Sequence, residues 1–246
     1  MTAVRAVNLT KKYREKTAVD SIDLSVESGE LFALLGVNGA GKTTTIRMCT
    51  CLSAPSSGKV EICGHDTIKE SSAVKAVVGI SPQDTAVAEN LTVYENLVLA
   101  AEIYGFSKQK THDRAEEMIR LFNMDEVRSS RAKTLSGGWK RKVSIAMALV
   151  SEPQVLFLDE PTLGLDVLAR RELWKVIRSL KGRITIILTT HYMEEAEQLS
   201  DRIAIMVGGK IKALGTLPEL ENITGQTGLE NVFVSIAEKS AGGDAE

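Results

Sequence analysis

The loop over residues 36–43 has the residue types and the spacing of a phosphate-binding loop. It reads GVNGAGKT, which fits the pattern G-x-x-x-x-G-K-[ST], and it lies between an apolar run at residues 31–35 and a segment of helical character. Glycines allow backbone N–H groups to curl around phosphate oxygens, and the positive end of the following helix points at the same anion. We therefore expect Lys42 to reach the β- and γ-phosphates of a nucleotide and Thr43 to bind Mg²⁺.

A pair of carboxylates ends the apolar segment at residues 154–161, which reads QVLFLDEP. In enzymes with such a phosphate loop, the first carboxylate, Asp159, would lie at the carboxyl end of a strand and help to hold Mg²⁺. Glu160 would then polarise a water molecule against the γ-phosphate, and a positioned general base contributes a factor of about 10²–10⁴. An isolated Asp–Glu pair is more often a solvated strand end, but the phosphate loop in the same chain favours the catalytic interpretation.

A third motif, LSGG at residues 135–138, precedes a helix that we expect to begin near Lys140. With this motif in place, the sequence resembles the ATP-binding subunit of ABC transporters from about residue 4 to 220. The phosphate loop is similar to the Walker A motif of that family, LFLDE at residues 156–160 is similar to its Walker B motif, and LSGG is similar to its signature.

The resemblance implies roles for residues that carry little signal alone. Gln83 would be the glutamine of the Q-loop, Asp166 the aspartate of the D-loop and His191 the switch histidine. Tyr13 stands where the family has an aromatic ring that stacks on adenine. The implied catalytic residues are Lys42, Gln83, Glu160 and His191, and the implied Mg²⁺ ligands are Thr43, Gln83 and Asp159. The implied ATP-binding residues are Tyr13, Gly36, Asn38, Gly39, Ala40, Gly41, Lys42, Thr43, Thr44, Ser136, Gly137, Gly138 and Asp166.

One position departs from the family pattern. The residue after LSGG is usually glutamine there, whereas this chain has Trp139. Because the serine and both glycines are intact, we expect the contact with phosphate to survive. Trp139 either packs on the neighbouring helices, as a tryptophan in a first helical turn ordinarily does, or alters the contact with the nucleotide.

The resemblance implies an ATPase that uses ATP and Mg²⁺ to power a membrane transporter. Two ATPase subunits would pair head to tail, with each ATP between the phosphate loop of one subunit and the signature of the other, and integral membrane permease subunits would complete the transporter. A homodimer is expected, because the catalytic and signature residues occur on one chain. Residues 162–166 and 229–233 are similar to those of prokaryotic drug, sodium or polysaccharide exporters, which favours export over import.

Two other functions remain as alternatives. The chain could be an ABC-type ATPase that acts on ribosomes or nucleic acid, or a regulatory module that binds nucleotide without turnover. Relatives that act on ribosomes usually have two ATPase units in one chain, and DNA-repair relatives insert long coiled coils or zinc modules; this sequence shows neither feature. Glu160 and His191 argue against a module without turnover.

The elements that must position these residues follow from the hydrophobic pattern. Residues 21–27 alternate as a half-buried strand does, and apolar runs predict strands at residues 31–35, 155–158, 184–188 and 203–207. Further short strands are expected at residues 60–63 and 77–80. Helical spacing is found at residues 42–52, 92–104, 110–122, 140–149 and 167–180. Strands that alternate with helices predict an α/β fold.

The predicted fold is a P-loop NTPase core with a mixed sheet, an N-terminal antiparallel β subdomain and an inserted α-helical subdomain. We expect a single ABC ATPase domain over residues 1–240. Its ATPase core would comprise residues 1–89 and 150–225, its helical subdomain residues 90–149, and residues 226–246 would form a C-terminal extension whose end is frayed from about Ser240.

Composition narrows the class of protein further. With 43% hydrophobic and 25% charged residues, the chain is neither disordered nor collagen-like. A net charge of −2 and 4% aromatic residues argue against a nucleic-acid partner. The longest stretches without charged side chains, residues 31–41 and 48–58, are too short to span a membrane, which takes about 20 apolar residues. We therefore expect a cytoplasmic subunit that is peripheral on the inner face of the cell membrane.

Overall fold

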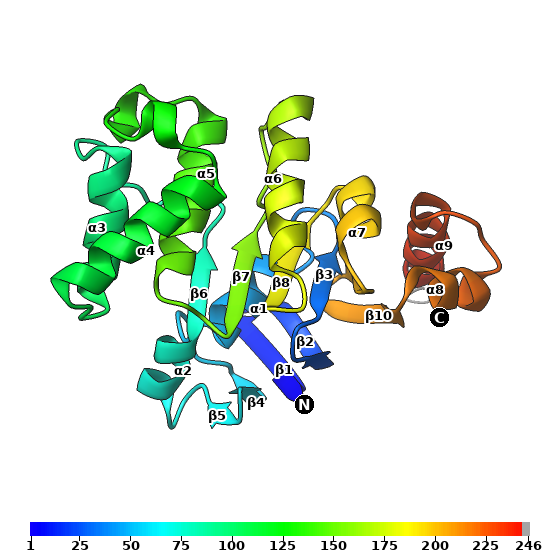
Figure 1. Cartoon of the computed structure of the whole chain (residues 1–246). Coiled ribbons are helices and arrows are strands. Elements are labelled where there is room, and N and C mark those ends of the chain that lie inside the picture. Colours follow the sequence, from blue (N-terminus) through cyan, green and yellow to red (C-terminus); the bar gives the residue numbers. More distant parts are fainter. Residues whose placement is uncertain (243–246) are drawn as a thin grey trace.

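The computed structural model describes residues 1–242, and these form two β-sheets with helices packed around them (Figure 1). The helices between residues 93 and 150 lie together at one end of the molecule, the sheets lie in the middle, and the helices after residue 216 lie at the other end. The predicted α/β fold, with a mixed sheet, an antiparallel β subdomain and an inserted helical subdomain, is confirmed.

The larger sheet positions the motifs because its parallel strands end at a common edge. It contains β3 (Leu31–Leu35), β6 (Val78–Ser81), β7 (Val155–Asp159), β8 (Thr185–Thr190), β9 (Arg202–Val207) and β10 (Lys210–Gly215). Their order is β10-β9-β3-β8-β7-β6, and every neighbouring pair is parallel except β9 and β10. β3, β7 and β8 are buried at each position, as strands covered on both faces are. The segments that follow β3, β6, β7 and β8 therefore meet at one edge of the sheet.

Helices cover one face of this sheet and share a large apolar core with it. These are α3 (Val93–Ile103), α4 (Lys108–Leu121), α5 (Gly137–Val150), α6 (Val167–Leu180), α7 (Met193–Leu199), α8 (Leu217–Thr224) and α9 (Leu229–Gly242). α3 begins at a capping box, in which the Thr92 hydroxyl accepts from the N–H of Glu95 and the Glu95 carboxylate accepts from the N–H of Thr92. Short 3₁₀ turns occur at Asp125–Val127 and Ala132–Thr134. Within residues 1–242, no helix combines the length and the apolar character that crossing a bilayer requires.

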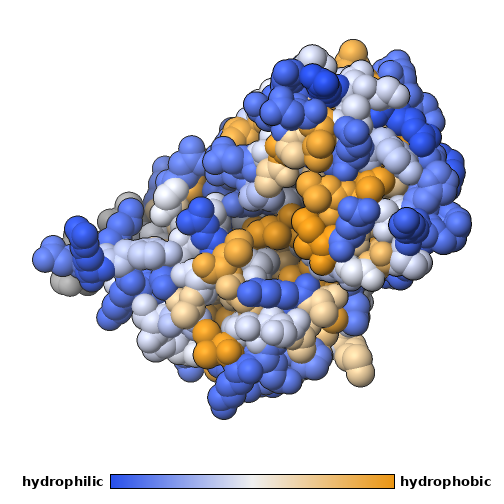
Figure 2. Space-filling model, turned by 90° about the vertical axis from the view of Figure 1, so that its left-hand side faces the viewer, coloured by the Kyte–Doolittle hydropathy of each residue, from blue (hydrophilic) through white to orange (hydrophobic). Residues whose placement is uncertain are grey.

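The surface at the helical end carries exposed apolar side chains. Leu99 and Ile103 of α3 and Tyr104 at its carboxyl end are exposed, Ile103 by 75%. Figure 2 shows this side of the molecule, where apolar residues gather around a hollow that is rimmed by hydrophilic residues.

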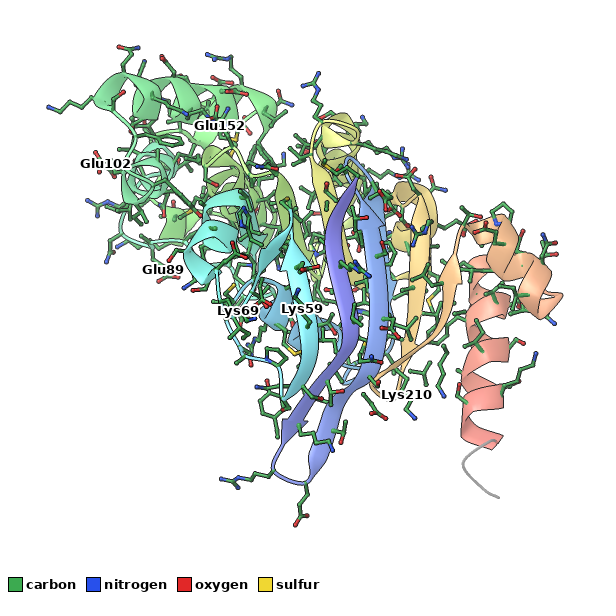
Figure 3. All side chains as sticks on the ribbon, turned by 90° about the horizontal axis from the view of Figure 1, so that it is seen from below. Lys59, Lys69, Glu89, Glu102, Glu152 and Lys210 are labelled. Atoms are coloured by element: carbon green, nitrogen blue, oxygen red, sulfur yellow. The ribbon has the colours of Figure 1, made fainter. Side chains whose placement is uncertain are left out.

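The smaller sheet is antiparallel and holds the remaining part of the core. It contains β1 (Thr2–Tyr13), β2 (Lys16–Glu27), β4 (Ser57–Ile62) and β5 (His65–Asp66) in the order β2-β1-β4-β5. A second apolar cluster joins it to α1 (Lys42–Cys49) and to the other face of the larger sheet, through residues such as Leu24, Ile46 and Phe32. α2 (Ser71–Val77) leads from β5 into β6. Seen from below, the long strands β1 and β2 lie side by side (Figure 3).

Two predicted helix boundaries are corrected. α1 ends at Cys49 instead of about Leu52, because Cys51 adopts a left-handed conformation with φ 60°. α5 begins at Gly137 instead of near Lys140, because the Ser136 hydroxyl caps it by accepting from the N–H of Trp139.

The C-terminal extension is only partly described. The segment predicted as an extension at residues 226–246 contains α9, which the hydrophobic pattern did not reveal. The last part of its predicted frayed end, residues 243–246, lies outside the described residues.

Candidate active site

The phosphate loop connects β3 to α1 and is held against two other strands. Gly41 has φ 108°, a conformation that side chains rarely adopt. A Cβ atom there would lie 2.4 Å from the carbonyl oxygen of Ala18 on β2, and one at Gly36 would lie 2.5 Å from that of Met206 on β9. The two glycines therefore allow a close approach that any larger residue would prevent.

Lys42 turns back into the loop that it follows. Its Nζ donates to the carbonyl oxygens of Gly36 at 2.7 Å and Val37 at 3.3 Å, and it lies 3.1 Å from Oε1 of Glu160. The lysine side chain is buried, so its charge is compensated by these oxygens and not by water. The result is a fixed cation inside a loop of glycines, which suits the binding of a phosphate anion.

Thr43 and Asp159, two of the predicted Mg²⁺ ligands, are in direct contact. Thr43 Oγ1 donates to Asp159 Oδ1 at 3.0 Å, and Thr189 Oγ1 donates to the same oxygen at 2.6 Å. Hydroxyl and carboxylate oxygens are the donors that Mg²⁺ prefers, and this ion usually takes one or two protein ligands beside phosphate oxygens and water. Residues 1–242 contain no cluster of three or more acidic, His or Cys side chains that could hold a metal alone. The residues present therefore fit a Mg²⁺ ion that binds together with a nucleotide.

Glu160 follows β7 in a left-handed conformation, with φ 50°. Such a backbone costs of order 1–3 kcal/mol in a residue other than glycine and persists where surrounding contacts fix it. Here the N–H of Glu160 donates to the carbonyl oxygen and to Oγ1 of Thr189, at 3.2 and 3.0 Å. Its carboxylate reaches Lys42 through Oε1 and His191 through Oε2, which lies 2.7 Å from Nδ1. The buried carboxylate is thus held between a cation and the imidazole that follows β8.

A cavity of about 400 Å³ brings together predicted site residues from four parts of the chain. It is lined by Tyr13, Lys16, Ala18, Asn38, Gly39, Gly41, Lys42, Thr43, Thr44, Gln83 and Glu160. Tyr13 ends β1 and is 46% exposed, so its ring is free to stack on a planar base. Gln83 follows β6 and shares the cavity with Thr43 and Glu160. Chemically, this arrangement can bind a polyphosphate beside a base that activates water.

Comparisons with known proteins agree with this geometry. The family model for ABC transporter matches residues 19–163. The daunorubicin resistance ATP-binding protein DrrA3 of Streptomyces coeruleorubidus is 40% identical over 225 residues, which are 91% of this chain and 71% of that protein. This chain belongs to the ABC transporter family.

Two further relatives of this ABC protein match over most of its length. The Nod factor export ATP-binding protein I of Paraburkholderia xenovorans is 40% identical over 214 residues, 87% of this chain and 70% of that protein. The solved structure of an ATP-binding subunit of an ABC transporter has a TM-score of 0.86 at 32% identity and covers 95% of this chain and 99% of its own. The predicted activity is confirmed at the level of the family: this chain is an ATPase that couples ATP hydrolysis to transport.

The ABC signature lies outside the cavity of its own chain. Ser136 is the N-cap of α5, and Gly137 and Gly138 form its first turn; of the described residues that line the cavity, none belongs to this motif. Asp166 also lies outside, where its Oδ1 caps α6 by accepting from the N–H groups of Leu168 and Ala169, at 2.9 and 3.0 Å. One chain therefore carries two separate sets of predicted nucleotide-binding residues.

Trp139 takes the packing position that its place in the first helical turn allows. It packs against the larger apolar core, and Nζ of Lys142 lies 4.3 Å from the centre of its ring. The same Nζ lies 2.9 Å from the carboxylate of Glu172 on α6. Trp139 therefore lies beside the lysine that joins α5 to α6.

Sequence reasoning misses three buried polar residues near the site, Thr189, Arg141 and Glu195. Thr189 gives a usable signal, because a hydroxyl inside an apolar strand needs a hydrogen-bond partner. Arg141 and Glu195 lie on α5 and α7, and a charged residue on a helix is ordinarily solvated, so the pattern alone gives no reason to expect them inside.

Glu195 of α7 is fully buried and lies close enough to Glu160 for the two carboxyl groups to interact. Its Oε1 accepts from Nε1 of Trp174 at 3.0 Å, and its Oε2 has no hydrogen-bond partner among the described residues. Burial raises the pKa of this carboxyl above its ordinary value, against the opposing effect of the nearby Thr190 hydroxyl and the Trp174 indole.

Proposed function

We propose that this chain is the ATP-hydrolysing subunit of a prokaryotic exporter and works with a separate membrane permease. The observation that carries the catalytic part is the Glu160 carboxylate, held between Lys42 and His191 in the nucleotide cavity. Export is supported by the relatives named for drug resistance and for Nod factor export. The function places the chain on the inner face of the cell membrane, bound through its permease.

Nucleotide binding follows from the cavity. Tyr13 would stack on the adenine ring, and the backbone N–H groups of residues 36–43, with Thr44 beside them, would surround the phosphates. Lys42 would exchange its ion pair with Glu160 for the β- and γ-phosphates, which frees the carboxylate for catalysis. Thr43, Asp159 and Gln83 would hold Mg²⁺. The bound ion would neutralise negative charge on the phosphates.

Hydrolysis requires a base beside the γ-phosphate. The oxygen of a water molecule would form a bond to the γ-phosphorus while the bond to the β–γ bridging oxygen breaks, and Glu160 would accept the proton of the water. His191 would fix the carboxylate through the 2.7 Å contact of Nδ1 with Oε2 and orient the γ-phosphate with the rest of its ring. The hydrogen bonds of Thr189 to the Glu160 N–H and to Asp159 keep both carboxylates at their strand end.

A second copy of the chain would complete each site. The amino terminus of α5 with Ser136 offers N–H groups and the positive end of a helix dipole to a phosphate, but it lies outside the cavity of its own chain. In a head-to-tail homodimer, the signature of one copy would bind the ATP held by the phosphate loop of the other. Such a ligand stabilises the closed pair by mass action, and loss of phosphate would open it.

The permease would bind at the helical end of the molecule. The exposed apolar side chains of α3 and the hollow in Figure 2 support a protein partner there. Gln83 lies at the junction between the nucleotide cavity and the segment leading into α3, so it can respond both to the nucleotide and to the permease. The net charge of −2 gives no support for binding to nucleic acid.

Co-purification from native membranes tests the transport function. We expect an integral membrane protein to co-purify with the tagged chain in mild detergent, because the permease contact buries apolar surface. A variant with Leu99 and Ile103 both changed to Asp should lose that protein and keep its own ATPase activity. Recovery of ribosomes in place of a membrane protein would contradict the proposal and favour the non-transport alternative.

A further inference from the structure

Arg141 is a buried cation that the mechanism above does not use. It lies on α5, in the turn after the signature, and is 4% exposed. Its Nη1 donates to the carbonyl oxygen of Pro82 at 2.7 Å, and its Nη2 donates to that of Gln83 at 2.5 Å. Among residues 1–242, no carboxylate lies close enough to form a salt bridge with it, so backbone oxygens are its hydrogen-bond partners.

A buried arginine between α5 and β6 loses the hydration of its charged guanidinium group, which costs free energy. Burial lowers the pKa of its guanidinium, although the carboxyl groups of Asp159, Asp84, Glu195 and Glu160 oppose this by attracting the charge. An apolar side chain could pack between α5 and β6 without that desolvation cost. The planar fork of arginine gives something that packing does not, because it fixes two consecutive carbonyl groups in one geometry.

Two other contacts tie the same segment to the same helix. Ser144, about one turn after Arg141 on α5, has its Oγ 2.9 Å from the Oγ of Ser81, and both are buried. At the other end of the segment, Nζ of Lys140 lies 3.4 Å from the carboxylate of Glu89, which is labelled in Figure 3. α5 therefore holds residues 81–89 at their start, at the Pro82–Gln83 pair and at their end.

We propose that Arg141 is a positioning residue for ATP hydrolysis, which fixes the backbone of Gln83 to the signature helix so that the position of this helix sets the place of the Gln83 side chain in the cavity. The proposal rests on the proposed function, since it takes Gln83 and the signature as parts of two nucleotide sites. In a dimer, Gln83 would serve the ATP of its own chain and the signature that of the other copy. Arg141 then links the nucleotide site that contains Gln83 to the site that the signature serves, because it lies on the helix that the signature begins.

The variant Arg141→Lys tests this link while keeping the positive charge. An ammonium on a flexible stem cannot hold two carbonyl groups in the fixed geometry of a guanidinium. We expect kcat for ATP to fall by about tenfold to a hundredfold, the effect of a displaced catalytic group, while KM changes by less than about threefold because the phosphate loop is untouched. Amide hydrogen exchange of residues 83–89 should become at least about tenfold faster, while that of residues 36–44 should stay unchanged.

Arg114→Lys is the matched control. Arg114 lies on α4, and its Nη2 and Nε donate to the carbonyl oxygens of Leu149 and Val150, at 2.8 and 3.1 Å. It thus holds two consecutive carbonyl groups in the same subdomain, but neither Leu149 nor Val150 lines the nucleotide cavity, as Gln83 does. Its variant should keep kcat within about twofold and leave the exchange of residues 83–89 unchanged. Equal effects in both variants would show a general loss of packing and overturn the proposal.

A double variant tests whether Arg141 acts through Gln83. In a Gln83→Ala background, Arg141→Lys should lower kcat no further, because the side chain that it positions is gone. Losses that multiply would overturn the proposal, as would normal kcat and normal exchange in Arg141→Lys. Should this variant fail to fold, Arg141→Gln should give the same fall in kcat and the same faster exchange, because it buries no charge and has one amide nitrogen in place of the guanidinium fork. If the wild-type chain itself does not hydrolyse ATP, the proposed function fails, and the exchange comparison with Arg114→Lys still decides whether Arg141 fixes this segment.

Discussion

Glu160 shows how one side chain satisfies two demands that conflict. A general base must be ionised, but a buried carboxylate loses its hydration. The ion pair with Lys42 and the contact with His191 compensate that loss in this structure. The same lysine must turn to phosphate when ATP binds, so the negative charge of Glu160 would be left unpaired at the moment when it is needed as a base.

Glu195 leads to a prediction about the pH dependence of stability. Its pKa is raised from an ordinary value of 4.5, so above that pH the folded chain holds a proton that the unfolded chain releases. Its contribution to stability is therefore largest at low pH and is lost as pH rises through the folded pKa, by up to about 1.4 kcal/mol per pH unit. Glu195→Gln does not titrate, so its free energy of unfolding, measured by urea unfolding, should rise relative to that of the wild type as the pH increases above about 4.5.

A neighbouring glutamate provides the control for this pH profile. Glu194 lies on the same helix, is exposed and pairs with Arg170 at 3.5 Å. Glu194→Gln should follow the wild-type profile to within a few tenths of a kcal/mol, the usual size of an exposed ion pair. If Glu195→Gln also ran parallel to the wild type, the raised pKa of Glu195 would be wrong.

At the scale of elements, the amino termini of helices position several of the predicted nucleotide-binding residues. Ser136 begins α5 and Asp166 begins α6, so two predicted nucleotide contacts are also N-caps. Gly138 of the signature lies close to Ala169 of α6, where a Cβ atom would be 3.4 Å away. The signature and the D-loop are therefore neighbours in one chain, although both lie outside its cavity.

Substitutions of Asp166 separate its capping role from its predicted nucleotide contact. Asp166→Ala removes the acceptor for two N–H groups and should lower the free energy of unfolding by about 1 kcal/mol, whereas Asp166→Asn should keep it within a few tenths, because both residues cap helices equally well. Urea unfolding measures both values. Any loss of ATPase activity in Asp166→Asn then belongs to the nucleotide contact. Equal loss of stability in the two variants would contradict the capping geometry.

The elements that could be predicted are those with a strong local pattern. The buried strand β3, the Gly-rich loop and the strand β7 before Glu160 each combine an apolar run with a motif. The structure places β3 and β7 in one sheet with β8 between them, and the loop and Glu160 line the same cavity. The hydrophobic pattern misses α2, α7, α8 and α9. Three of these, α2, α7 and α8, have only seven or eight residues, which is too short for a clear helical period. Arg141 could not be found from the sequence, since its carbonyl partners lie on a different element and carry no residue signature.

At the scale of the whole molecule, the separation of the two predicted nucleotide-binding sets is the main feature. The cavity holds Tyr13, the phosphate loop, Gln83 and Glu160, while the signature begins a helix that lies outside that cavity. A single copy would leave the γ-phosphate of its ATP without the signature. The larger apolar core continues from the sheet into the helical end. A shift of α5 can therefore affect both the cavity residues and the signature residues.

The most direct test of this account is the mass of the Glu160→Gln variant in solution with Mg·ATP. Loss of the base should slow turnover by about 10²–10⁴-fold, so ATP stays bound and joins two copies. We predict that light scattering gives twice the mass of one chain with Mg·ATP and the mass of one chain with Mg·ADP. Adding Ser136→Glu should abolish the pairing, because a carboxylate would repel the phosphate of the other copy. A Glu160→Gln chain that binds Mg·ATP and stays single, or pairs equally well with Ser136→Glu, would contradict the account.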